Sequence, residues 1–216
     1  MNTTVPVQAQ LFIAPGCPHC PAVLQIMSNL IKTGEIAELD VTNIVAAPEK
    51  ARQFNVRSVP WIKIGPFELT GAHTKTELQT WINRVHSPTG MIEYFNELFT
   101  QGELKKVTAL IKKDTHLLTT LLQMVGDEDT PLGSRIGISA IFEELKGKKI
   151  LSTLIPQLEK LIRSDNKSIR NDACYYLGLT ENPDVVPLIQ SLSDESDADI
   201  LETIDDALEI IYQANH

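Results

Sequence analysis

Hydrophobic and polar positions along the first 86 residues follow two periods in turn. Strand-like runs such as "QAQLFIA" are followed by segments with apolar residues three and four positions apart, which is the spacing of an amphipathic helix. Gly and Pro separate these segments, and Thr74 with Glu77 has the spacing of a capping box. The predicted elements are strands at 8–14, 35–41, 61–65 and 67–71 and helices at 17–32, 47–55 and 74–85. This βαβαββα order predicts an α/β domain with helices packed on a sheet.

The pattern changes after the Ser87-Pro88-Thr89-Gly90 segment, because no strand signal follows it. We therefore predict a domain at 1–86, a linker at 87–90 and an all-α domain at 91–216. Helical periodicity predicts helices at 91–100, 103–112, 115–125, 132–146, 150–163, 168–178, 184–193 and 198–212.

The helical part repeats itself. Ile169, Ala173 and Leu177 match Ile200, Ile204 and Leu208 at an offset of 31 residues, and the preceding helices match as well. Paired helices with a period above 30 residues are typical of solenoids. The run Ile-Arg-x-x-Ala-x-x-x-Leu-Gly at 169–178 resembles a HEAT-type repeat, and the resemblance is good over about 150–212.

Charge is unevenly distributed. The net charge is −9, and residues 87–216 carry 12 Lys and Arg against 22 Asp and Glu. A nucleic-acid partner is therefore not expected, because binding to phosphates needs a basic patch. The first residues lack the basic segment of a secretory signal, and no apolar run reaches membrane-spanning length. We expect a cytoplasmic protein without a membrane partner.

Cys17 and Cys20 are the main chemical feature, since Cys-x-x-Cys beside a βαβ pattern indicates a dithiol redox motif. As N-cap of the first helix, Cys17 would accept hydrogen bonds from the N–H groups of His19 and Cys20, with Pro18 at the first helical position. The helix dipole and a protonated His19 also favour a thiolate, so we expect a lowered pKa for Cys17. Cys17 is the predicted nucleophile and Cys20 the resolving thiol.

Val59-Pro60 lies immediately before a predicted strand. A cis bond there would turn the backbone so that Val59 offers its polar groups to an extended substrate. Trp61 is predicted either to line the same groove or to pack in the core, with equal weight.

The motifs Cys17-Pro18-His19-Cys20 and Val59-Pro60, in a βαβαββα order, resemble the thioredoxin superfamily, and most of all small archaeal-type glutaredoxin-like thioredoxins. The resemblance covers about residues 6–86. It implies thiol–disulfide exchange in which Cys17 attacks, Cys20 resolves and Pro60 is the cis-proline. Gly16 replaces the usual tryptophan, Gln8 falls about where a buried acid is usual, and the glutathione-binding glycine and acid are missing. Neither the proton relay nor glutathione dependence is carried over.

Metal binding is the main alternative role for the cysteine pair, and Cys174 has a separate role. A closed zinc site needs four ligands, and neither a second Cys-x-x-Cys nor a spaced histidine pair occurs, so no metal or other cofactor is expected. Cys174, in the apolar "NDACYYLG" stretch, is predicted to be a buried structural thiol.

The sequence therefore predicts a thiol–disulfide oxidoreductase, with the reducing direction favoured. Its partners are a protein disulfide or dithiol substrate and an electron donor or acceptor that the sequence does not identify. The helical half is predicted to dock a protein partner, against the alternative of a rigid spacer or oligomerisation unit. The rival hypothesis is a redox-sensing scaffold without turnover.

Overall fold

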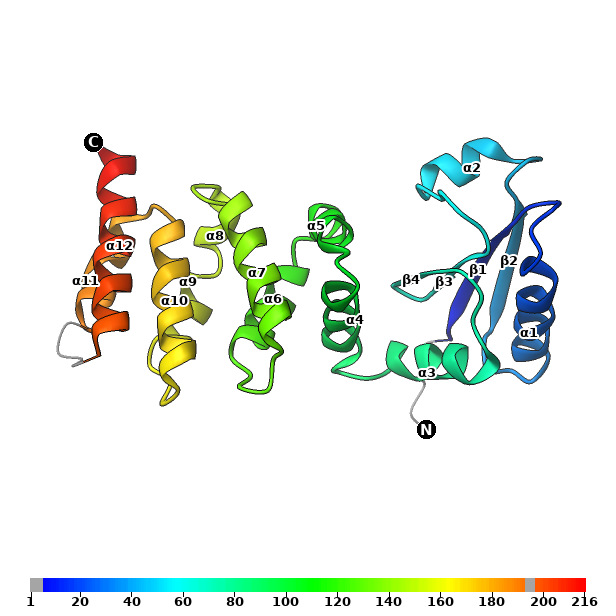
Figure 1. Ribbon diagram of the computed structural model, residues 1–216, viewed down its shortest axis with the longest axis horizontal. Helices are drawn as coiled ribbons and strands as arrows, with labels where there is room; N and C mark the ends of the chain where they lie inside the picture. Colours follow the sequence, from blue (N-terminus) through cyan, green and yellow to red (C-terminus); the bar gives the residue numbers. More distant parts are fainter. Residues whose placement is uncertain (1–5, 193–196) are drawn as a thin grey trace. The chain divides into compact units, whose positions relative to one another are not determined.

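A computed structural model describes residues 6–192 and 197–216 (Figure 1). Residues 1–5 of the predicted first domain and residues 193–196 lie outside the described residues, and so does the end of the helix predicted at 184–193. Within the described ranges, no helix is both long enough and apolar enough to cross a membrane.

The chain divides into two compact units, one up to Met91 and one from Ile92. The first is an α/β unit around a four-stranded sheet, and the described part of the second is all helical, which confirms the predicted fold class. The first unit contains β1 (Gln8–Ile13), α1 (Cys20–Lys32), β2 (Glu38–Asn43), α2 (Pro48–Gln53), β3 (Trp61–Ile64), β4 (Phe67–Thr70) and α3 (Lys75–Val85).

The sheet has the strand order β2-β1-β3-β4. β1 pairs with β2 in parallel, from Gln8 opposite Glu38 onwards, while β3 is antiparallel to both β1 and β4. Side chains on paired strands alternate between the two faces. Phe12 and Trp61 therefore share one face, which the helix α2 covers. On the other face α3 packs its Trp81 against Phe67.

The second strand begins three residues later than predicted because the preceding helix end uses the residues before it. Gly34 has a φ of +78° and closes α1. The N–H groups of Glu35 and Ile36 both donate to the carbonyl of Leu30, in the manner of a helix C-cap. These residues complete the helix end instead of pairing in the sheet, and β2 starts at Glu38.

The second unit is built of short helices that follow one another along the chain (Figure 1). They are α4 (Gly90–Thr100), α5 (Leu104–Lys113), α6 (Leu117–Val125), α7 (Leu132–Glu144), α8 (Lys149–Ser152), α9 (Ile155–Leu161), α10 (Lys167–Leu179), the 3₁₀ helix η1 (Pro183–Val185), α11 (Val186–Gln190) and α12 (Ala198–Asn215).

Two predicted helices are interrupted in the structure, each next to a proline. The helix expected at 150–163 is divided into α8 and α9, with Pro156 in the first turn of α9. The helix expected at 184–193 starts as η1, and Pro187 lies in the first turn of α11. Proline has no N–H to donate to the preceding turn, so it is accommodated at the start of a helix and not inside one.

The 31-residue repeat is visible in the helix caps. Asn166 caps α10 by accepting from the N–H groups of Ser168 and Ile169, and Asp197, 31 residues later, caps α12 by accepting from Asp199. Ile169 and Ile200, which also differ by 31, are both buried. The two helices therefore use equivalent residues for the same tasks.

Close packing of α10 on α12 gives a stability prediction. A Cβ atom at Gly178 would lie 2.7 Å from Cα of Ala207, which is backbone and does not move away easily. We expect Gly178→Ala to lower the free energy of unfolding by about 2 kcal/mol in urea titrations followed by circular dichroism. The control is Gly133→Ala in α7, where a Cβ meets nothing within 4 Å. This control should be neutral or stabilising by about 0.5–1 kcal/mol, and equal losses from both variants would contradict the packing account.

Candidate active site

The cysteine pair lies in the connection between β1 and α1. Cys17 follows a turn in which its N–H donates to the carbonyl of Ala14 over 3.3 Å, and Gly16 in that turn has a φ of +88°, which favours glycine. Cys17 and Cys20 are joined as a disulfide, with 5.5 Å between their Cα atoms. Cys17 is half-buried, whereas Cys20 is only 3% exposed. Of the two sulfur-bearing residues, Cys17 is therefore the accessible one.

The predicted N-cap position of Cys17 is wrong. The helix α1 begins at Cys20 with His19 as its N-cap, so Pro18 precedes the helix and does not occupy its first position. The reason is Pro21, which lies in the first turn. An N-cap carbonyl accepts from the N–H four residues later, and for Cys17 that residue is a proline without an N–H. His19 meets the requirement, because its carbonyl accepts from the N–H of Val23.

One of the two predicted hydrogen bonds to the Cys17 sulfur is present. The N–H of Cys20, the first residue of α1, donates to Sγ of Cys17 over 3.1 Å. Helix N-termini have unsatisfied N–H groups and a positive dipole end, and both favour a thiolate over a thiol. A reduced Cys17 therefore lies just outside the helix, and one N–H donor of the helix stabilises its thiolate.

The segment before β3 meets the cysteine pair. The Val59–Pro60 peptide bond is cis, as predicted, and Sγ of Cys17 lies 3.6 Å from the carbonyl oxygen of Val59. Pro60 is buried, and its own carbonyl accepts from the N–H of Gly71 over 2.9 Å. Val59 is half-buried beside the sulfur. The structure thus brings Cys17 and Val59 together from segments 42 residues apart.

Sequence reasoning missed the contribution of Gly71, which is bonded to Pro60 and has a φ of +97°. The sequence signal for this contact was the glycine that directly follows β4. The last residue of that strand, Thr70, is opposite Trp61 in the strand register. A position with a φ in this range favours glycine.

Trp61 packs in the core, which is one of its two predicted alternatives. Its side chain is 4% exposed, and its ring packs edge-on against Phe12, with 5.2 Å between the centroids, and beside Phe54. The ring belongs to the core under α2, so the packing alternative describes it.

The remaining predicted residues lie as follows. Pro18 and His19 are exposed between the two cysteines, and no side-chain hydrogen bond from His19 caps α1. Gln8 is exposed at the start of β1, where its amide donates to Glu38 over 3.0 Å, so it does not occupy a buried position under the cysteines.

His19 tests whether a charge between the cysteines affects Cys17. If a protonated imidazole stabilises the thiolate, His19→Ala should raise the pKa of Cys17 and slow its alkylation about twofold at pH 6, which corresponds to a small exposed-charge interaction. The readout is thiolate absorbance together with iodoacetamide labelling. An unchanged titration would make His19 a surface residue without effect.

Cys174 is separate from this chemistry. It is fully buried in α10, as predicted, and burial raises the pKa of its thiol to about 12. It therefore stays protonated and inaccessible near neutral pH. In the described part of the chain, no three His, Cys, Asp or Glu side chains are arranged to hold a metal ion.

The site combines three groups: the accessible sulfur of Cys17 next to a helix N-terminus, the buried sulfur of Cys20 within bonding distance of it, and the carbonyl of Val59 beside Cys17. Such a pair can exchange a disulfide with another molecule, because a mixed disulfide on the outer sulfur can be attacked by the inner one. This defines the class of protein: a dithiol exchange protein with a thioredoxin-like sheet.

Comparison with known proteins gives the family. The model of the thioredoxin domain family matches residues 7–83. The thioredoxin of Methanocaldococcus jannaschii is 35% identical over 74 residues, which is 33% of this chain and 87% of that protein. The chain therefore belongs to the thioredoxin family through its first unit. Its close cysteine pair is of the thiol–disulfide oxidoreductase kind.

Proposed function

We propose that this protein reduces a disulfide in a partner protein, with Cys17 as nucleophile and Cys20 as resolving thiol, and that its helical half docks that partner. The observation that carries the proposal is the position of the Cys17 sulfur. It is the more accessible of the pair, it accepts a hydrogen bond from the N–H of Cys20, and it lies beside the carbonyl of Val59.

The exchange has two steps. The Cys17 thiolate attacks one sulfur of the substrate disulfide, a Cys17–substrate disulfide forms, and the other substrate sulfur leaves as a thiolate that takes up a proton. The Cys20 thiol then loses its proton and attacks Sγ of Cys17. The Cys17–Cys20 disulfide forms and the second substrate sulfur leaves as a thiol. Two electrons have passed from the protein to the substrate, and of the two protons that the substrate sulfurs gain, one comes from Cys20 and one from solvent.

The backbone before Pro60 supports the binding of an extended substrate. The carbonyl of Val59 faces the sulfur at 3.6 Å, so a substrate strand paired with Val59 would place its own cysteine next to Cys17. Pro18 and His19 are exposed in the segment between the two cysteines. We assign these residues to substrate contact and Pro60 to holding the segment in place.

We favour the reducing direction on thermodynamic grounds. We propose a cytoplasmic location, and the cytosolic redox poise keeps such dithiols mostly reduced. The oxidised protein then needs a second dithiol protein or reductase as electron donor, which the residues of this chain do not specify.

The docking role of the helical half rests on its architecture. In the helical half, α10 and α12 are equivalent helices of two successive helix pairs. Helix pairs that repeat in this way present extended surfaces of the kind that solenoids use for binding. We retain the resemblance to HEAT repeats as part of this proposal. The rival, a redox-sensing scaffold, takes the same site and surfaces but predicts no turnover.

Turnover separates the two hypotheses. The full-length protein should reduce a small aromatic disulfide catalytically when dithiothreitol regenerates the dithiol, with many cycles per molecule. A single stoichiometric burst without further cycles would favour the sensor.

The docking role is tested with residues 1–86 alone, once their cooperative unfolding has been demonstrated. This fragment should match the full-length rate on the small disulfide and lose kcat/KM only on the native partner. Equal rate ratios for both substrates would contradict docking.

A further inference from the structure

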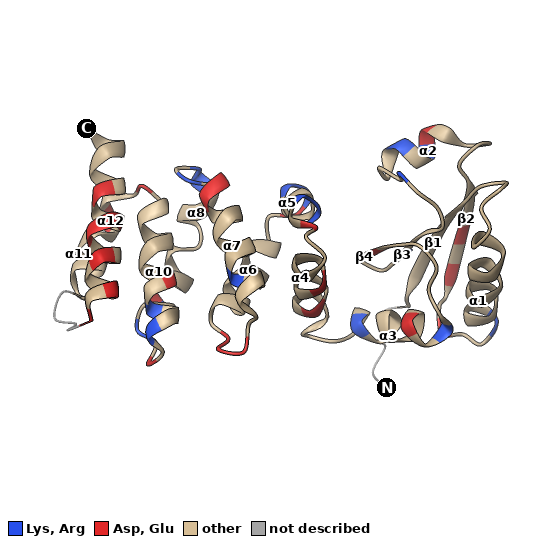
Figure 2. Cartoon of the chain, viewed as in Figure 1, with Lys and Arg blue, Asp and Glu red and all other residues tan. Residues whose placement is uncertain are grey.

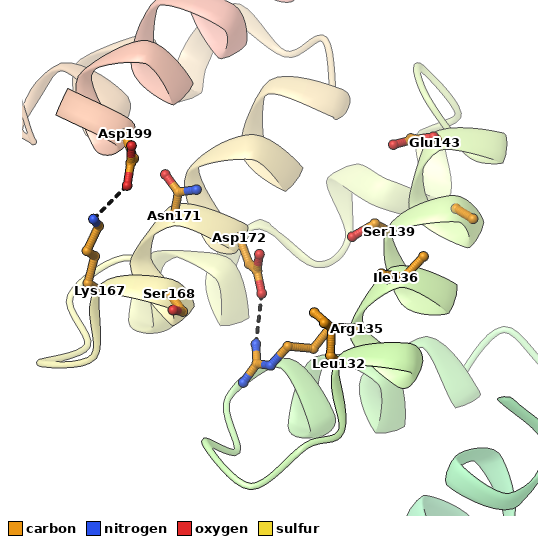
Figure 3. A pocket seen from close by; sticks show the side chains of 11 residues that line it. Leu132, Arg135, Ile136, Ser139, Glu143, Lys167, Ser168, Asn171, Asp172 and Asp199 are labelled. Atoms are coloured by element: carbon orange, nitrogen blue, oxygen red, sulfur yellow. Dashed lines mark hydrogen bonds and ion pairs between the residues drawn. The ribbon is translucent and has the colours of Figure 1, made fainter. Parts of the chain in front are cut away.

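The helical half contains a groove. It lies between α7, α10 and the start of α12 and has a volume of about 590 Å³ (Figure 3). We call it the α10 groove, and the lining residues used below are Leu132, Ile136, Glu143, Asn171, Asp172 and Asp199. All of them belong to the second unit, far along the chain from the cysteine pair.

Apolar side chains are exposed at one side of this groove. Leu132 is 74% exposed and Ile136 is 62% exposed, although both are large hydrophobic residues. They are four residues apart in α7 and so lie on the same face of the helix. Neighbouring apolar side chains that remain in water at the rim of a groove indicate a contact surface for another molecule.

The two cations of the groove are already engaged. Arg135 donates to Asp172 over 2.8 Å and to the carbonyls of Val125 and Asp127. Lys167 lies 2.6 Å from Asp197 and 2.8 Å from Asp199. These two bases hold the helices to their own loops and neighbours, so they are not available to attract an anionic ligand.

Two further carboxylates face no base, Glu143 in the groove and Asp206 on α12. Glu143 is exposed and accepts a hydrogen bond from the hydroxyl of Tyr175 over 3.2 Å. Tyr175 and Asp206 are 31 residues apart and so take equivalent positions in α10 and α12, which pack closely against each other at Gly178 and Ala207. Burial, then the charge of Glu143 and this hydrogen bond, and finally the charge of Asp206 raise the pKa of Tyr175. Among the described residues neither Glu143 nor Asp206 has a Lys or Arg within ion-pair distance.

The acidic character continues along α12. Figure 2 shows acidic residues along this helix and no basic ones. Its acidic residues are Asp199, Glu202, Asp205, Asp206 and Glu209.

A buried polar atom in the groove lacks a hydrogen-bond partner, since Oδ1 of Asn171 is buried without a hydrogen bond. Figure 3 shows Asn171 between Asp172 and Asp199. A buried acceptor of this kind is usually satisfied by a donor.

We propose that the α10 groove binds an extended segment of the partner protein in which a Lys or Arg lies two to four residues from an apolar side chain. The proposal rests on the docking role proposed above and assigns it a surface and a ligand chemistry. The apolar side chain covers Leu132 and Ile136. The basic side chain lies between Glu143 and Asp206, next to the ring of Tyr175.

The spacing follows from helix and strand geometry. Ile136 and Glu143 are seven residues apart in α7, about 10.5 Å along the helix axis at the usual rise. An extended chain advances about 3.3 Å per residue. A segment that runs along α7 therefore covers this distance in about three residues, which sets the range of two to four.

The test measures binding alone, with short fluorescein-labelled peptides in a Gly/Ser background that place Leu and Arg two, three or four positions apart. Fluorescence anisotropy with the full-length protein should show saturable binding that weakens with added salt. Glu143→Gln with Asp206→Asn should weaken binding about tenfold, as expected for two exposed charge contacts. The matched control, Glu103→Gln with Glu128→Gln, removes the same charge from exposed positions outside the groove and should change nothing.

The apolar contact has its own variant. Leu132→Ser with Ile136→Ser should weaken binding about tenfold without unfolding the protein, because both side chains are exposed. The proposal is overturned if no Leu/Arg peptide binds at millimolar concentration, if a peptide with Arg→Glu binds as well, or if both groove variants bind like the wild type. Self-association of the full chain that the groove variants abolish, without peptide binding, would make a second copy the occupant and overturn it too.

Failure of this proposal and failure of the proposed function give different results. The small-disulfide turnover assay depends only on the cysteine pair, so it should be unchanged in every groove variant. Normal turnover with no peptide binding would leave the oxidoreductase standing and remove the α10 groove as its docking surface. Absent turnover with normal peptide binding would do the reverse.

Discussion

Replacing Cys17 by serine should reduce disulfide turnover by about a thousandfold or more. A serine hydroxyl is not ionised near neutral pH, so the attacking atom is lost while the backbone turn that holds it remains. The residue is only half-buried, and we therefore expect the fold and the thermal stability of the reduced protein to change little. The measurement is the steady-state rate with a small aromatic disulfide and dithiothreitol.

The control for this variant is Cys174→Ser or Cys174→Ala. Because Cys174 is fully buried and its pKa is raised to about 12, removing its thiol should leave turnover unchanged even if it lowers stability. Turnover that survives in Cys17→Ser, or that disappears in the Cys174 variants, would show that the nucleophile has been assigned to the wrong sulfur.

Replacing Cys20 by serine should convert the protein into a trap for its partner. The Cys17 sulfur can still form a mixed disulfide, but no second thiolate is present to attack it, so the adduct accumulates instead of turning over. On non-reducing gels of a cell extract, bands of higher mass should appear that dithiothreitol removes. Mass spectrometry should place the linkage on Cys17.

Two companion variants separate the loss of the resolving thiol from a loss of stability. Cys20 is 3% exposed, and a buried hydroxyl without a partner is destabilising, so Cys20→Ala should be tested in parallel and should trap as well. The double variant Cys17→Ser with Cys20→Ser should trap nothing. Adducts through Cys174, or equal adducts from Cys17→Ser alone, would contradict the two-step exchange.

The order and type of the elements in the first unit were predictable because strands and helices carry different hydrophobic periods. Pro15, Gly16 and Gly34 mark the ends of β1 and α1 in the sequence itself. The start of β2 was not predictable from periodicity, since the N–H groups of Glu35 and Ile36 are used by the end of α1. Local hydrogen bonding at a helix end overrode the apolar pattern.

At the candidate site, the sequence indicated the two sulfurs and the cis bond but not the helix boundary. The four-residue hydrogen-bond rule applied to Pro21 excludes Cys17 as N-cap, so this signal was present in the sequence. The burial of Trp61 was different in kind. It depends on Phe12 and Phe54, which the fold brings to the same face from other elements. The sequence around Trp61 does not predict this packing.

The central claim is that Cys17, beside the first N–H of α1, is the reactive thiol, and the order of alkylation tests it most directly. The fully reduced wild-type protein is treated with a limiting amount of iodoacetamide at pH 7 and the labelled peptides are quantified by mass spectrometry. The account predicts that Cys17 is labelled at least about tenfold faster than Cys20, and that Cys174 is labelled only after unfolding in urea. Labelling of Cys20 at an equal or higher rate than Cys17 would contradict the account.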